Sequence, residues 1–179
     1  MTVREKLLNP TGSGKDTGSG SLAPWPASLR GLTVGLLGTT KPNAEVLLAE
    51  IAAELKDRYD IGELRPYTKD YFGTPVKADL LDQIAADCDL VITAVGDCGS
   101  CSAATVADGI LFERAGVPAV SVVSDSFLLP ARAMARIQGF PGFEFIAVRH
   151  PVASLGATEL RERVQDVLPD VLRIIGAAA

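Results

Sequence analysis

The sequence has few of the residues that ordinarily carry chemistry or mark a secreted protein. It contains one histidine and three cysteines among 179 residues. An odd and small number of cysteines is not typical of a disulfide-stapled secreted fold, so we expect a reducing, cytoplasmic environment. The N-terminus lacks the apolar segment of a signal peptide, and no apolar run approaches the length needed to span a bilayer.

The chain also has no excess of positive charge. Lysine and arginine number 17 against 22 acidic residues, which gives a net charge of −5 and a pI of about 4.9. Because nucleic-acid-binding proteins present a basic face, we expect no nucleic-acid partner and no membrane partner, but a small-molecule substrate. The hydrophobic content of 47% and the length are typical of one soluble globular domain with a sizeable core.

The beginning of the chain differs in composition from the remainder. Residues 1–28 are predicted to form an N-terminal arm, flexible or packed on a partner, and residues 29–179 an α/β domain. The segment Thr11–Ser21 is small, polar and without periodicity. Leu22 and Trp25 can bury area only against the domain or against another subunit. We therefore expect a homo-oligomer, a dimer, with a hetero-oligomer containing a paralogous subunit as the alternative.

From Leu32 onward, apolar runs alternate with helical patterns. The predicted strands are residues 32–37, 63–67, 90–95, 119–123 and 143–148, and the predicted helices are 42–59, 76–86, 101–115, 127–138 and 158–175. We expect Thr40 to cap the first helix, and Pro66 places the second strand at a sheet edge. Right-handed crossovers between such elements produce a parallel sheet with helices on both faces. The prediction is a flavodoxin-like, Rossmann-like three-layer sandwich with five parallel strands in the order 2-1-3-4-5.

The pair of cysteines in Cys98-Gly99-Ser100-Cys101 is the strongest chemical signal in the chain. It lies between the apolar run Leu90–Val95, a predicted buried strand, and a predicted helix. A helix N-terminus stabilises a thiolate and lowers the pKa of a thiol. Gly99 and Ser100 are small, so the backbone can turn tightly and leave the sulfurs uncovered. We expect a nucleophilic thiolate at Cys98 and a resolving thiol at Cys101.

Two other interpretations of this cysteine pair are a zinc site and two inert buried thiols. A zinc site ordinarily needs a second pair of ligands, and the only other candidates are Cys88 and His150. Cys88, just before the third strand, is predicted to be a structural core residue. Gly38 lacks the companion glycines of a dinucleotide-binding fingerprint. We therefore predict no metal and no cofactor, other than an external thiol or dithiol reductant.

His150 follows the fifth predicted strand. Ligands bind at the carboxyl ends of the strands in an open parallel sheet, so His150 is predicted to lie on the ligand-binding edge. An imidazole exchanges protons near neutral pH, which suits an acid, a base or a substrate-orienting group. A structural histidine is the alternative. Strands three and five would lie about 10 Å apart across strand four, and His150 would then act through the substrate and not touch Cys98.

The same edge supplies the predicted substrate-binding residues. They are Lys41, Asn43, Asp97, Gly99, Ser100, Asp125 and Ser126. Lys41 opens the first helix, where backbone amides can bind an anion, although an ordinary solvated lysine is the alternative. Asp97 would raise the pKa of the neighbouring thiol if it faced it, but we favour hydrogen bonds to turn amides. Asp125 and the serine after it either line the pocket or cap the next helix.

The segment Gly96–Cys101 resembles the central motif of the UGSC family of (seleno)proteins, which is named for a selenocysteine-Gly-Ser-Cys sequence. The resemblance covers nearly the whole chain and extends through Leu8–Gly12, Lys41–Ala44, Ala94–Asp97, Glu113–Pro118 and His150–Pro151. The selenocysteine position of the family falls on Cys98, so the chain looks like a cysteine-containing member.

That family looks distantly similar to the selenoprotein B subunit of glycine reductase, in which a selenol displaces a group from carbon. The resemblance implies that Cys98 attacks an activated carbon or heteroatom and that Cys101 releases the adduct by forming a disulfide. The expected function is reductive or substitutive cleavage of a bond to carbon in a small polar substrate. A cysteine-dependent lyase or hydrolase without a disulfide step, and a non-catalytic subunit of a larger complex, are the alternatives.

Overall fold

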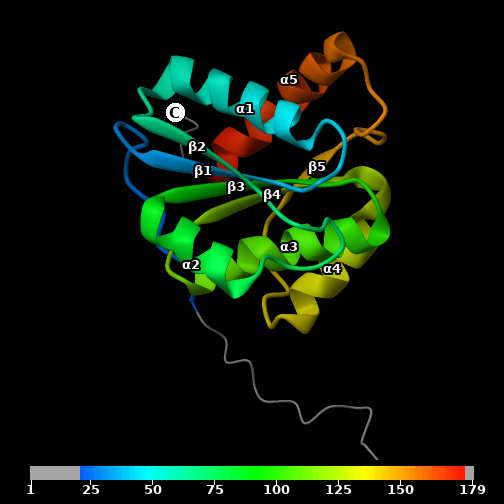
Figure 1. Cartoon of the computed structure of the whole chain (residues 1–179), viewed down its shortest axis with the longest axis horizontal. Helices are drawn as coiled ribbons and strands as arrows, with labels where there is room; N and C mark the ends of the chain where they lie inside the picture. The colour runs from blue at the N-terminus through cyan, green and yellow to red at the C-terminus, as the bar shows by residue number, and fades with distance from the viewer. Residues whose placement is uncertain (1–20, 176–179) are drawn as a thin grey trace, which may run out of the picture.

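The computed structural model describes residues 21–175, which form a central parallel sheet with helices on both faces (Figure 1). The five strands lie in the order β2-β1-β3-β4-β5, and every neighbouring pair is parallel. Their bounds are β1 Thr33–Gly38, β2 Glu63–Thr68, β3 Leu90–Gly96, β4 Ala119–Ser124 and β5 Ile146–Val148. The predicted α/β class, the single sandwich domain and the strand order are confirmed.

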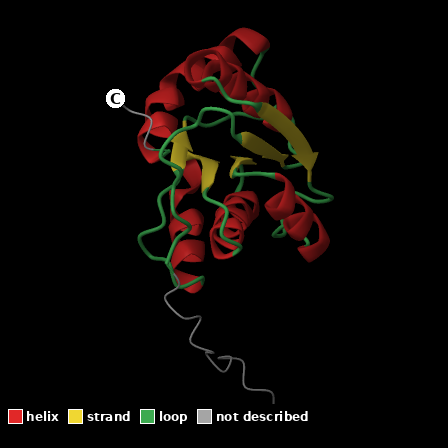
Figure 2. Ribbon diagram, turned by 90° about the vertical axis from the view of Figure 1, so that its left-hand side faces the viewer, coloured by secondary structure: helices red, strands yellow, loops and turns green. Residues whose placement is uncertain are grey.

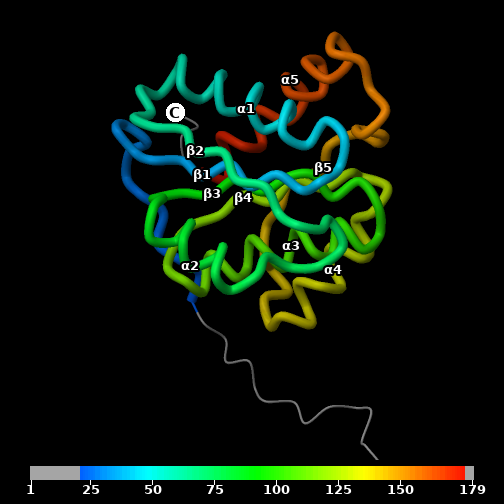
Figure 3. Tube along the Cα trace, viewed as in Figure 1, coloured from blue at the N-terminus to red at the C-terminus, as the bar shows by residue number. Residues whose placement is uncertain are grey.

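Helices cover both faces of the sheet, as the ribbon in Figure 2 and the Cα trace in Figure 3 show. One face carries α1 Ala44–Tyr59 and α5 Ala157–Ile174. The other face carries α2 Ala78–Asp87, α3 Gly99–Arg114 and α4 Leu128–Ile137. A short 3₁₀ helix, Asp125–Phe127, joins β4 to α4. None of the helices within residues 21–175 is long and apolar enough to cross a membrane.

Burial follows the position of each strand in the sheet. Every residue of β3 and β4 is buried, because these strands have neighbours on both sides and helices on both faces. The predicted edge position of β2 is confirmed: it pairs with β1 alone, contains Pro66 and is buried at none of its residues. Apolar side chains from the sheet, α1 and α5 form one core, and two smaller clusters lie under the other helices.

Several element ends differ from the predicted ones. The first helix begins at Ala44 and not at residue 42, because Asn43 takes the left-handed conformation (φ 65°) and is the N-cap, so the expectation of a cap at Thr40 was wrong. The third helix begins at Gly99, and Cys98 is its N-cap. The last strand is short because Phe143 turns into the cluster under α3 and α4.

The described part of the predicted arm lies against the domain. Trp25 packs on the main core, and the backbone N–H of Ala23 donates to Glu113 Oε2 at 2.6 Å. Glu113 is near the C-terminal end of α3, so this contact lies at the edge of the sheet opposite the cysteine pair. Residues 1–20, which include the family-like segment Leu8–Gly12, lie outside the described residues.

Candidate functional site

The carboxyl ends of β1 and β3 meet at the point where the strand order reverses. These strands are neighbours, but the helices that follow them lie on opposite faces of the sheet. Ligands of open α/β sheets bind where the two loops diverge in this way. The loop after β1 is held to β3, because the N–H of Thr39 donates to the carbonyl of Ala94 at 2.8 Å and its hydroxyl bonds the backbone of Val95. The loops that carry Lys41 and Cys98 are thus adjacent.

The two cysteines of the motif form a disulfide between the N-cap and the first turn of α3. Their Cα atoms are 5.2 Å apart. Cys101 is fully buried, whereas Cys98 is half-buried and its sulfur accepts a hydrogen bond from the N–H of Cys101 at 3.3 Å. In the reduced protein, the Cys98 sulfur lies at the N-terminus of a 16-residue helix, where a thiolate is stabilised.

Gly96 and Gly99, on either side of Asp97 and Cys98, have different roles in the turn from β3 to α3. A Cβ at Gly96 would lie 2.5 Å from Cα of Ser102, so only glycine lets the first turn of α3 pack directly on the end of β3. The hydroxyl of Ser102 then donates to the Gly96 carbonyl at 2.8 Å. At Gly99 the surroundings are open, because a Cβ there would meet no atom within 4 Å beyond its chain neighbours and its own helix backbone. The expectation that both sulfurs are uncovered is correct in part for Cys98, which is half-buried, and wrong for Cys101, which is fully buried against the end of the sheet. Ser100 is exposed, and its Oγ lies 3.6 Å from Cys98 Sγ.

Asp97, the neighbour of Cys98, joins the ends of three strands. Its side chain is 3% exposed and accepts four hydrogen bonds. One oxygen accepts from the hydroxyl of Ser124 and from Nδ1 of His150, the latter at 2.8 Å. The other accepts from the N–H groups of Val152 and Ala153, at 3.0 and 2.8 Å. The preference for amide hydrogen bonds was correct, although these amides belong to the loop after β5.

The environment of Asp97 keeps this carboxyl ionised. Burial raises its pKa, but the hydrogen bonds from Ser124, the two amides and His150 together outweigh that effect and lower the pKa below its usual value. A carboxylate has no proton to donate, so Nδ1 of His150 must be the donor in their hydrogen bond. Nε2 of His150 is then the nitrogen left to accept a proton.

His150 is held on two further sides. Its ring packs edge-on against Phe127, with centroids 5.3 Å apart, and its backbone N–H donates to Asp125 Oδ1 at 3.1 Å. Its side chain remains 36% exposed. Ser126 is exposed, and its hydroxyl lies 3.4 Å from Asp125. Asp125 therefore holds the backbone of the loop that carries His150 and caps neither of the helices that follow β4. Contact of Asp125 or Ser126 with a substrate stays a prediction.

The loop after β1 contributes Lys41 and Asn43. The side-chain amide of Asn43 donates to the carbonyls of Val152 and Leu155, at 2.9 and 3.0 Å, so it ties this loop to the loop after β5. Lys41 is half-buried, and its ammonium lies 4.5 Å from the centroid of the Phe72 ring. The predicted residues therefore gather at one edge from four of the five strand ends.

Three features of this region were missed by sequence reasoning. Ser124, the last residue of β4, is fully buried and donates to Asp97 and to the Gly96 carbonyl. Phe72 comes from the loop after β2, and no motif marks it. Lys69 and Asp108 form a buried ion pair at 2.6 Å between this loop and α3. Position was the only available signal: Ser124 directly follows the predicted fourth strand, and Lys69 lies in the loop after the predicted second strand.

Asp108 holds both ends of the loop that carries Phe72. One carboxylate oxygen binds the ammonium of Lys69, and the other accepts from the N–H of Val76 at 2.6 Å. Burial raises the pKa of Asp108, while the positive charge and hydrogen bond of Lys69 oppose that effect. Removing one partner would leave an uncompensated buried charge, which is strongly destabilising.

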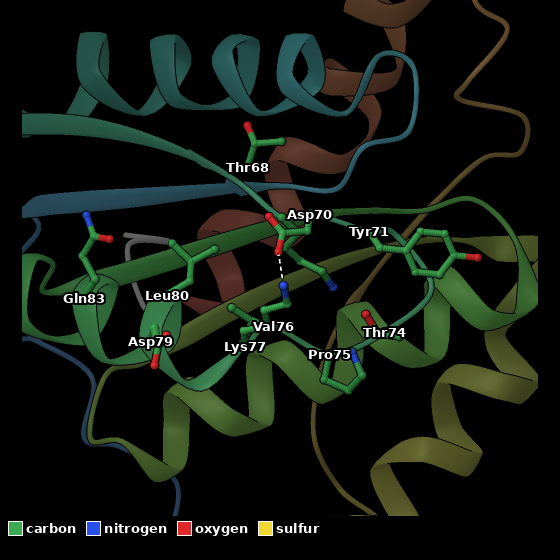
Figure 4. A pocket seen from close by; sticks show the side chains of 11 residues that line it. Thr68, Asp70, Tyr71, Thr74, Pro75, Val76, Lys77, Asp79, Leu80 and Gln83 are labelled. Atoms are coloured by element: carbon green, nitrogen blue, oxygen red, sulfur yellow. Dashed lines mark hydrogen bonds and ion pairs between the residues drawn. The ribbon is translucent and has the colours of Figure 1, made fainter.

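A separate pocket of about 600 Å³ lies between this loop and α2 (Figure 4). It is lined by Thr68, Lys69, Asp70, Tyr71, Thr74, Pro75, Val76, Lys77, Asp79, Leu80 and Gln83. The figure shows Asp70 and Lys77, two of the lining residues, facing each other as an ion pair, and both side chains are exposed. None of the predicted catalytic or substrate-binding residues lines this pocket, so it is distinct from the Cys98 site. Over the described range 21–175, no three His, Cys, Asp or Glu side chains are grouped to hold a metal ion.

Comparison with known proteins supports the family resemblance of the motif around Cys98. The family model described as the UGSC family matches residues 6–177. The match does not extend to selenoprotein B of glycine reductase, so that more distant similarity is not shown. A search of curated proteins found no match.

Proposed function

The chain belongs to the UGSC family, and we propose that it is a thiol-dependent enzyme in which Cys98 is the nucleophile and Cys101 the resolving thiol. The reaction is reductive cleavage of a bond to carbon in a small polar substrate. The observation that carries the proposal is the position of Cys98. It is the half-exposed N-cap of α3, at the strand-order reversal, bonded to a buried cysteine one turn away.

The two cysteines divide the reaction between them. The Cys98 thiolate attacks the carbon of a substrate R–X, a C–S bond forms, and X leaves with the electron pair of the broken bond. The Cys101 thiolate then attacks the Cys98 sulfur. The disulfide forms, and R leaves with the C–S electron pair and takes up a proton. An external thiol or dithiol supplies the two electrons that reduce the disulfide, so each turnover converts R–X to R–H.

His150 is suited to deliver that proton. Its imidazole is held by the Asp97 carboxylate, and Nε2 remains to gain and release a proton. Asp97 does not need to contact the substrate: it orients the imidazole, a role that a carboxylate plays beside a catalytic histidine. The carboxylate that holds the imidazole is the residue directly before Cys98 in the chain.

A second function is favoured by the same Asp97–His150 pair. A cysteine that shares a sheet edge with a carboxylate-oriented histidine is also compatible with a covalent hydrolase or lyase. In that case water or elimination releases the adduct, no electrons are consumed, and Cys101 is not needed for turnover. Dependence on Cys101 and on an external thiol separates the two functions.

The test is to trap the adduct. Cys101→Ser protein is exposed to a small-molecule extract of cells, and its intact mass is measured. We expect a mass increase that peptide mapping places on Cys98 and that is absent from the Cys98→Ser/Cys101→Ser double variant. The mass of the adduct identifies R. Modification that is absent, or that lies on Cys88, contradicts the proposal.

A further inference from the structure

We propose that Thr105, Asp108 and Lys69 form a buried proton relay that converts the Cys101 thiol to the thiolate needed for the resolving step. This inference rests on the proposed function, because it concerns the second half of that reaction. It gives a chemical role to a buried ion pair and a buried hydroxyl that the chemistry at Cys98 does not use. In this relay the Thr105 hydroxyl meets the thiol, and Asp108 acts through Thr105.

The resolving cysteine needs a base inside the protein. Cys101 is fully buried, so bulk water does not reach its thiol, and burial disfavours the charged form of a thiol. Its place in the first turn of α3 stabilises a thiolate once the proton has left. In the proposed reaction His150 delivers a proton to R, so a separate group must accept the proton of Cys101.

Three residues of α3 that can exchange protons share the face that packs on the sheet (Figure 1). Cys101, Thr105 and Asp108 are all fully buried, and their spacing places them on one side of the helix. Residues three or four apart on a helix have Cβ atoms about 5–6 Å apart, so each group lies within reach of the next. Because helical side chains tilt toward the N-terminus, the carboxylate points toward the hydroxyl and the hydroxyl toward the thiol.

The hydroxyl of Thr105 is available to pass a proton between its neighbours. It is fully buried and has no hydrogen-bond partner among the described residues, 21–175. A threonine inside a helix commonly donates to a carbonyl of the preceding turn, and a buried hydroxyl without a partner is rare. In the structure Cys101 is oxidised and carries no proton, whereas the reduced thiol supplies an S–H donor on the same helix face.

Asp108 is held as an ionised proton acceptor. Its Oδ2 binds the ammonium of Lys69 and its Oδ1 accepts from the N–H of Val76, both at 2.6 Å. A carboxylate has about four lone-pair sites, so each oxygen can accept a further hydrogen bond. Burial raises the pKa of Asp108, which makes it a stronger base than an exposed aspartate.

The charged surroundings of the relay are limited to this ion pair. β3 and β4, on which α3 packs, contain no charged residue. The charged residues of α2 and α4 are exposed, as are Asp70 and Lys77 in the loop after β2. The other buried carboxylate of α3, Glu113, binds two backbone N–H groups at the far end of the helix. Proton transfer from Cys101 to Asp108 therefore leaves the net charge of the interior unchanged, and no ion has to enter it from water.

The relay is restored within each turnover. The Cys101 S–H donates its proton to the Thr105 hydroxyl as that hydroxyl passes its own proton to Asp108. The thiolate then attacks the Cys98 sulfur, and the C–S electron pair leaves with R. When the external dithiol attacks Cys98, Cys101 departs as a thiolate and takes the proton back from Asp108. The electrons come only from the dithiol.

The test follows the two cysteines separately with dipyridyl disulfide, each half of which leaves as a coloured pyridinethione. One equivalent is added to fully reduced protein. The first release reports attack by Cys98, and the second reports attack of Cys101 on the resulting mixed disulfide. Thr105→Val keeps the shape of the side chain and should slow the second release about a hundredfold at neutral pH, as expected for loss of a positioned acid–base group. The first release should not change. Thr105→Ser retains the hydroxyl and should keep the wild-type rates.

The pH profile separates a relay from a packing defect. In Thr105→Val the second release should rise in proportion to hydroxide concentration and approach the wild-type rate at alkaline pH, where hydroxide deprotonates the thiol. A packing defect slows the release equally at every pH. The double variant Asp108→Asn/Lys69→Met removes the acceptor together with its counter-charge and should show the same profile as Thr105→Val. Asp97 and His150, the titratable groups at the Cys98 end, are the same in every variant.

Thr93→Val is the matched control. Thr93 is also fully buried without a hydrogen-bond partner in the described range, but it lies on β3 and not on the helix that carries Cys101. Its substitution should leave both releases unchanged. An unchanged second release in Thr105→Val and in the double variant, or a slowing of equal size at every pH, overturns the relay. A wild-type protein that lacks either release overturns the proposed function instead.

Discussion

The carboxylate of Asp97 accepts a hydrogen bond from Nδ1 of His150 at 2.8 Å, although β4 separates the strands that these residues follow. The contact spans the gap because Asp97 directs its side chain across the end of β4, where Ser124 also donates to it. The only histidine of the chain is therefore coupled to the loop that carries Cys98. The proposed chemistry depends on the hydrogen bond between Asp97 and His150.

The three thiols should differ in reactivity. Cys98 is half-buried at a helix N-terminus, whereas Cys101 is fully buried and Cys88 is 7% exposed with a pKa raised by its burial. In reduced protein, limiting iodoacetamide should modify Cys98 before Cys88 and Cys101, as measured by peptide mapping at graded reagent concentrations. Faster labelling of either other cysteine would contradict the assignment of Cys98 as the nucleophile.

Mild oxidation should join Cys98 to Cys101 within one chain. The sulfurs are bonded in the structure and the Cα atoms are 5.2 Å apart, so no backbone movement is needed to form the bond. Non-reducing peptide mapping should find this linkage and leave Cys88 free. Oxidised protein that contains only intermolecular disulfides would exclude a resolving role for Cys101.

His150→Ala should affect chemistry more than folding. The imidazole is 36% exposed, so its loss should lower the free energy of unfolding by about 1 kcal/mol or less. The same variant should show an altered pH dependence of Cys98 alkylation, since a protonated imidazole near the site favours the thiolate. A pH profile identical to that of the wild type, measured in the same stable variant, would place His150 among the structural residues.

Asp97→Asn should destabilise the protein in a pH-dependent way. At pH 7 the free energy of unfolding should fall by roughly 2 kcal/mol, because charged hydrogen bonds to Ser124, His150 and two amides are lost. The folded-state pKa of Asp97 lies below the usual 3.8, so its contribution is present well above pH 3.8 and disappears as pH falls through the lower folded-state value. Urea unfolding of both proteins from pH 7 downward should show their difference shrinking only at the acid end.

The buried Lys69–Asp108 pair should matter far more than the exposed Lys77–Asp70 pair of the same loop. Lys69→Met leaves the buried Asp108 carboxylate without its counter-charge and should lower the free energy of unfolding by about 3 kcal/mol. Lys77→Met, whose partner is exposed to solvent, should cause no measurable change. Equal effects of the two substitutions in urea unfolding would contradict this interpretation of the loop.

The sequence by itself determined the sheet and the place of the cysteines. The alternation of apolar runs with helical patterns predicted five strands and five helices, and Pro66 predicted the edge strand, because periodicity and proline chemistry act over a few residues. The strand order then placed Cys98 and His150 at one edge. Helix starts were less well predicted, since the left-handed conformation of Asn43 and the capping role of Cys98 depend on neighbouring loops.

Only the tertiary structure decided which side chains meet at that edge. Asp97 bonds Val152, 55 residues away, and Lys69 bonds Asp108, 39 residues away, and no local pattern encodes such pairs. They form because the sheet brings the ends of distant strands together and excludes water there, so a buried polar group must find a partner. The sequence placed a thiol at the end of a strand, and long-range packing supplied the carboxylate that orients the histidine at the same edge of the sheet.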